Sequence, residues 1–164
     1  MLKKLKLIIL SIFFCFYFHN KSVLSNDKNL LSFSGGIWDW NDAKTAGMVN
    51  LEYRHGKRYG IFKPMFGGLV NTDHGFYGYA GVRIDLYLTK KIVLSPSFAP
   101  GIYEKGDGKD LGHPIEFRSG LDLSYRRKNG ARVGMEVHHL SNASLDENNP
   151  GTETFLFTYS IPLN

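Results

Sequence analysis

The chain has 164 residues, a formal net charge of +5, a single cysteine and an aromatic content of 14%. Four lysines (Lys3, Lys4, Lys6 and Lys21) and the cysteine lie in the first 25 residues, so the remaining 139 residues carry a net charge of only +1. Residues 26–164 therefore exclude a disulfide framework, a thiolate nucleophile and a cysteine metal site, and their charge does not predict nucleic-acid binding.

Residues 1–25 have the pattern of a cleaved signal peptide. A basic start precedes an apolar core at 7–18, which is too short for a membrane-spanning helix of about 20 residues. Val23 and Ser25 suit the small positions of a cleavage site. An uncleaved anchor is the alternative, but polar residues soon after the core favour cleavage. We predict a mature chain of one domain, residues 26–164.

The pattern of the remaining residues predicts membrane-spanning β-strands. Eight segments of roughly ten residues alternate between apolar and polar side chains. In chain order they are 30–40, 46–54, 60–70, 76–88, 92–103, 115–126, 131–142 and 153–163. The clearest, 115–126, has one apolar face and one face that carries Glu116, Arg118 and Asp122. We therefore predict an all-β protein, an eight-stranded antiparallel transmembrane β-barrel of the bacterial outer membrane, with apolar side chains outside and paired charges inside.

Alternation alone also fits the inverse arrangement, a soluble secreted ligand carrier of lipocalin type with its charges outside. The connections favour the membrane barrel, because three are short and basic and two others are longer and rich in Gly, Asp and Asn. The short ones are 55–58, 89–91 and 128–130, and the longer ones are 104–114 and 143–152.

The prolines and the aromatic residues give two further predictions for the barrel wall. Proline has no N–H for a strand ladder, so Pro64, Pro96 and Pro100 predict bulges or strand ends. A set of aromatic residues is expected in the girdles at the membrane interfaces. It consists of Trp38, Trp40, Tyr77, Tyr79 and Tyr103.

The last two segments carry the candidate site. His139 and Ser141 share the apolar side of 131–142, and Glu153 lies on the apolar side of 153–163. Ionisable groups on a lipid-facing surface are costly and call for a functional reason. Ser141 as nucleophile, His139 as general base and Glu153 as orienting acid would form a serine esterase site for a lipid presented sideways from the membrane.

These residues resemble the PagL-type lipid A 3-O-deacylases, an outer-membrane enzyme family. The resemblance lies in His139-x-Ser141-Asn142, a short loop through Asn149, and Glu153 twelve residues after the serine. It implies hydrolysis of the ester-linked 3-O-acyl chain of lipid A, with lipopolysaccharide and outer-membrane lipids as partners and no cofactor or metal. It also implies that Asn149 and Asn142 help to form an oxyanion hole.

Several questions stay open at this point. The chain departs from common outer-membrane barrels by ending on Leu163-Asn164 rather than on an aromatic residue. A non-enzymatic structural or adhesive barrel is the alternative function. The sequence leaves open a monomer or a homodimer, the preferred acyl-chain length and the range of esters hydrolysed. His138 is expected to point into the barrel interior.

Overall fold

The computed structural model describes residues 27–41 and 45–163, so the predicted signal peptide lies outside the described residues. In this part of the chain no helix is long and apolar enough to cross a membrane. The strands are β1 (Leu30–Trp38), β2 (Ala46–Arg54), β3 (Lys63–Asn71), β4 (Phe76–Arg83), β5 (Leu86–Tyr87), β6 (Ile92–Glu104), β7 (Ile115–Arg126), β8 (Arg132–Ser141) and β9 (Thr152–Pro162).

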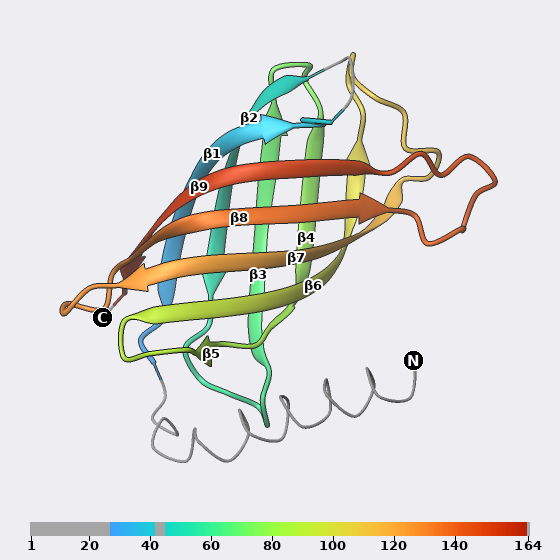
Figure 1. The fold of residues 1–164 in the computed structure, drawn as a ribbon. Helices are drawn as coiled ribbons and strands as arrows, with labels where there is room; N and C mark the ends of the chain where they lie inside the picture. Colours follow the sequence, from blue (N-terminus) through green and yellow to red (C-terminus); the bar gives the residue numbers. More distant parts are fainter. Residues whose placement is uncertain (1–26, 42–44, 164) are drawn as a thin grey trace, which may run out of the picture.

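These strands form one closed antiparallel barrel (Figure 1). Apart from β4 and β5, each strand pairs with its neighbours in the chain, and β1 also pairs with β9, which closes the sheet. β4 and the two-residue β5 both pair with β6 and together occupy the position of one interrupted strand. The barrel therefore has eight strand positions, which confirms the predicted fold class of an eight-stranded antiparallel β-barrel.

Proline explains the interruption between β4 and β5. The Ile84 amide donates to the Pro96 carbonyl at 3.0 Å, but Pro96 has no N–H with which to bond back to Ile84. The register between β4 and β6 also lapses beside Pro100. The expectation of bulges or strand ends is wrong for Pro96 and Pro100, because both lie inside the continuous strand β6, where the missing N–H interrupts only the pairing with the β4 side. Pro64 fits the expectation, since it is the second residue of β3.

Apolar side chains cover the outside of the barrel and polar ones fill it. On β8 and β9, the outward residues Val137 and Phe157 are 44% and 62% exposed, whereas the inward residues Glu136 and Thr158 are buried. An apolar exterior suits lipid and would be unfavourable in water. The structure therefore confirms the membrane arrangement and contradicts the inverted arrangement of a lipocalin-type carrier.

Two groups of buried charges inside the barrel have opposite charges beside them. Arg54 donates to Glu52 at 2.6 Å, to Asp122 at 2.8 Å and to Glu136 at 2.5 Å. A second group gathers Lys63 and two arginines around the Asp85 carboxylate. Pairing offsets much of the cost of removing these charges from water, so the interior is a packed polar core.

The expected aromatic girdle is mostly wrong. Trp38, Tyr77, Tyr79 and Tyr103 are at most 5% exposed and belong to the buried apolar cluster, while Trp40 is 55% exposed. Trp38 stacks on Tyr103 with ring centroids 5.5 Å apart. The physical reason is strand parity, because these four side chains point inward and fill one end of the lumen.

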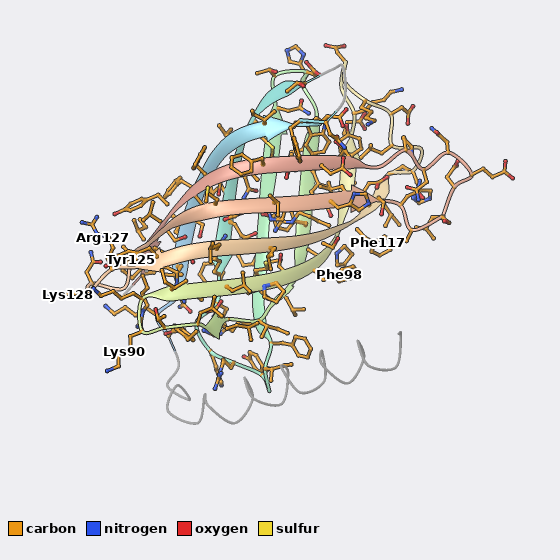
Figure 2. All side chains as sticks on the ribbon, in the orientation of Figure 1. Lys90, Phe98, Phe117, Tyr125, Arg127 and Lys128 are labelled. Atoms are coloured by element: carbon orange, nitrogen blue, oxygen red, sulfur yellow. The ribbon has the colours of Figure 1, made fainter. Side chains whose placement is uncertain are left out.

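The two ends of the barrel differ in their connections. We call the end that holds Leu30 and Pro162 the strand-terminus end, and the opposite end the loop end. The connections of the strand-terminus end carry basic residues, and Figure 2 shows Lys90, Arg127 and Lys128 there. Two loops of ten residues each lie at the loop end, the β6–β7 loop (105–114) and the β8–β9 loop (142–151). The predicted contrast in length is confirmed for these two loops.

Candidate active site

Strand pairing brings His139 and Glu153 together on the outer surface near the loop end. The two residues face each other directly in the register of β8 and β9. His139 Nδ1 and Glu153 Oε1 are 3.1 Å apart, and the two side chains are 49% and 35% exposed. Directly opposite positions in an antiparallel pair have close Cβ atoms, so the backbone itself sets this contact.

The imidazole ring of His139 leans toward the loop end and across β9. A Cβ built on Gly151 would lie 2.9 Å from His139 Cε1 and 3.5 Å from Nε2. Gly151 also has a φ of +63°, a conformation that residues with a side chain rarely adopt. The missing side chain of Gly151 therefore leaves room for the ring edge that carries Nε2.

Two serines flank this imidazole on the outer face. Ser141 ends β8, two residues beyond His139, and Ser119 of β7 lies directly opposite His139. Thr152 pairs with Leu140, so Gly151 lies across from Ser141. The Cε1–Nε2 edge of the ring thus lies on the β9 side, near Gly151, and away from β7, which carries Ser119. Within residues 27–41 and 45–163, no hydrogen bond joins either hydroxyl to the ring.

The two asparagines expected at the oxyanion hole differ in their surroundings. Asn149 is exposed, and its Oδ1 accepts a hydrogen bond from the backbone N–H of Asn142 at 3.0 Å. The Asn142 side chain is buried, and its Nδ2 donates to Leu111 O at 3.0 Å and to Asn148 O at 2.9 Å. The expectation that Asn142 supplies an oxyanion donor therefore does not fit its side chain, whose amide hydrogens are already used in holding two loops together.

Apolar side chains surround the pair. Phe117 faces Ser141 across β7 and β8, and it stacks on Phe98 with ring centroids 6.0 Å apart. Figure 2 shows these two rings near each other toward the loop end. Val137 precedes His139 on the same outward face and is exposed. A lipid acyl chain would find a continuous apolar surface here.

The remaining residues near the site include a second histidine, His138. His138 points inward as expected, is buried, and has Nδ1 3.2 Å from Thr154 Oγ1. No group of His, Cys, Asp or Glu in the part of the chain that the structure describes could hold a metal ion. Gly151 lies in the predicted connection 143–152. Its contact with His139 depends on the fold of the β8–β9 loop, which strand periodicity does not report.

A closed antiparallel barrel with a lipid-compatible exterior and a polar interior defines an outer-membrane β-barrel. Residues 27–162 match the family described as lipid A 3-O-deacylase (PagL). The chain therefore belongs to the lipid A 3-O-deacylase family, whose activity is ester hydrolysis, and it is a protein of the bacterial outer membrane.

Individual relatives agree with this assignment. The lipid A deacylase PagL of Pseudomonas aeruginosa is 25% identical over 144 residues, which cover 79% of this chain and 76% of the relative. The crystal structure of the outer-membrane enzyme PagL superposes with a TM-score of 0.62 at 18% identity, covering 82% of this chain and 99% of that one. A de novo designed transmembrane β-barrel reaches a TM-score of 0.56 at 12% identity, covering 85% of this chain and 98% of the design. The two structural matches support the fold alone.

Proposed function

We propose that this protein hydrolyses the ester-linked 3-O-acyl chain of lipid A in the outer leaflet by a Ser-His-Glu mechanism. The observation that carries the proposal is the contact of 3.1 Å between His139 Nδ1 and Glu153 Oε1 on the lipid-facing surface. Ser141 follows His139 by two residues on the same strand. Membership of the lipid A 3-O-deacylase family supports the choice of substrate. The loop end is taken to face the cell exterior, which puts the site at the level of the outer leaflet.

In the proposed mechanism, Glu153 holds the tautomer of His139 that carries a proton on Nδ1, leaving Nε2 as the base. Ser141 Oγ attacks the ester carbonyl carbon while its proton passes to Nε2. The tetrahedral intermediate then breaks the bond to the sugar oxygen, which takes that proton as it leaves. Water, activated by the same imidazole, hydrolyses the acyl-serine and releases a 3-hydroxy fatty acid. All the residues come from one chain, so the chemistry does not require a homodimer.

The direct test is mass spectrometry of lipid A from a bacterial host with and without this chain. The proposal expects lipid A to lose the mass of one 3-hydroxyacyl group when the chain is expressed and folded. Unchanged lipid A beside a correctly folded barrel would instead favour the structural or adhesive alternative.

Replacement of Glu153 by alanine should leave weak residual activity. Without the carboxylate the imidazole is no longer held in the required tautomer and orientation, and loss of the equivalent acid in a serine protease lowers kcat by about 10⁴-fold. We expect a reduction of roughly 10²–10⁴-fold in kcat on purified lipid A. Glu147→Ala is the matched control, because Glu147 is an exposed carboxylate in the neighbouring β8–β9 loop. Full activity of Glu153→Ala would remove this residue from the mechanism.

Asn149 is the proposed oxyanion donor. Its Oδ1 is held by the Asn142 amide, which leaves its Nδ2 hydrogens available to the developing negative charge. Loss of one such donor typically lowers kcat by about 10²–10³-fold, and we expect this for Asn149→Ala. Asn148→Ala, one residue earlier in the same exposed loop, serves as the control. An Asn149→Ala enzyme that is as active as Asn148→Ala would refute the assignment.

A further inference from the structure

The β6–β7 loop inserts one side chain into the loop end of the barrel. Leu111, in the middle of this loop, is 1% exposed and belongs to the same apolar cluster as Trp38, Leu140 and Leu156. The Tyr103 hydroxyl donates to the Lys109 carbonyl at 2.8 Å. Leu111 therefore anchors the loop in the core, although much of the rest of the loop is exposed.

Asp39 joins this loop to the first residues of β9. Its side chain is fully buried, and Oδ1 accepts from Lys109 Nζ at 3.0 Å and from Thr152 Oγ1 at 3.0 Å. Its backbone N–H donates to the Glu153 carbonyl at 2.8 Å. Asp39 has a φ of +55°, which residues other than glycine adopt when their surroundings hold them there. One buried carboxylate thus links Lys109 to the backbone that positions the proposed catalytic acid.

A second contact reaches the serine side of the site. The Asn142 side chain, directly after Ser141, donates to the Leu111 carbonyl at 3.0 Å. Gly112 lies so close to the β8–β9 loop that a Cβ would be 1.8 Å from the Asn148 carbonyl oxygen. The β6–β7 loop therefore touches the β8–β9 loop, which connects Ser141 to Glu153, at its first residue and again at Asn148.

We propose that the β6–β7 loop is a positioning element of the deacylase, and that Asp39 and Lys109 are positioning residues that act through Thr152 and Glu153. This inference rests on the proposed function. Removing the Lys109 charge leaves the Asp39 carboxylate buried without its cation, which destabilises the arrangement around it. The start of β9 then relaxes, and the Glu153–His139 contact lengthens. Displacements near 1 Å at a catalytic group can cost about 10²-fold in rate.

Lys109→Met is the direct test, with lipid A deacylation measured on the purified barrel in detergent. We expect kcat to fall by about 10–100-fold while KM stays within about twofold, because the lipid binds on the outside of the barrel. The rate at which a fluorophosphonate probe labels Ser141 should fall by a similar factor. Heat-modifiable migration on gels reports whether the barrel is folded. Lys105→Met is the matched control, since Lys105 pairs with exposed Asp110 at 2.8 Å in the same loop, and it should behave as wild type.

Asp39 provides the second arm, which also decides the matter should Lys109→Met not fold. Asp39→Asn keeps an oxygen for Thr152 and tolerates positive φ, so it should retain more kcat than Asp39→Ala. Wild-type kcat and labelling in folded Lys109→Met, a change in KM alone, or equal kcat in the two Asp39 variants would overturn the inference. A wild-type protein that leaves lipid A intact would instead refute the proposed function. These two failures are therefore distinguishable.

Discussion

Ser141→Ala should abolish release of the 3-hydroxy fatty acid from lipid A while the barrel still folds. The hydroxyl is the proposed nucleophile, and loss of the nucleophile in a serine hydrolase lowers kcat by about 10⁶-fold. Mass spectrometry of lipid A should show the substrate unchanged, and purified protein should show no turnover above background. The side chain is half-buried at the end of β8, and loss of its oxygen removes no hydrogen bond among residues 27–41 and 45–163.

Ser119 makes this test specific. It lies opposite His139 and is a second hydroxyl beside the imidazole, so strand pairing alone does not decide which serine attacks. The ring edge lies next to Gly151, which is on the β9 side of His139 and therefore away from Ser119 on β7. We therefore expect a fluorophosphonate to label Ser119→Ala but not Ser141→Ala. Labelling that survives in Ser141→Ala and disappears in Ser119→Ala would transfer the nucleophile to β7.

His139→Ala should be nearly as damaging as loss of the serine. Without Nε2, no group in the described site takes the proton from Ser141 Oγ, and loss of the histidine in a serine hydrolase also lowers kcat by about 10⁶-fold. Both the release of fatty acid and the labelling of Ser141 should fall to background. Measurements at constant pH on folded protein in detergent would show the effect.

His138 supplies the control for this histidine. It is the adjacent residue, but it points into the lumen, where Nδ1 lies 3.2 Å from Thr154 Oγ1. His138→Gln should affect the stability of the barrel more than its chemistry, and the folded fraction should keep its kcat. If His138→Gln lost labelling of Ser141 and His139→Ala kept it, the proposed general base would be wrong.

Much of the fold follows from the order of residues along each strand. Because successive side chains in a strand point to opposite faces, segments such as 115–126 show their two faces directly in the sequence. The same parity predicts that His139, Ser141 and Glu153 project to one side. The interrupted pairing on the β4 side of β6 follows from the missing N–H of Pro96 and Pro100.

The aromatic residues show how parity can be overlooked. Tyr77 and Tyr79 share a strand face with Arg83, and the charge of Arg83 indicates that this face lines the interior. Aromatic residues near strand ends, however, are also typical of a girdle. What separates the two cases is that one end of the lumen is filled by an apolar cluster, including Leu111 from a loop. No local pattern in the sequence indicates that a loop folds back into the barrel.

The sequence by itself determined the membrane barrel and the chemical types of the site, because both depend on which residues alternate and how far apart they lie. Only the tertiary structure decided the strand register that sets His139 against Glu153, the room that Gly151 leaves for the imidazole, and the contact of Lys109 with Asp39 across 70 residues. These depend on contacts between segments distant in the chain. Local periodicity carries no information about such contacts until the barrel closes.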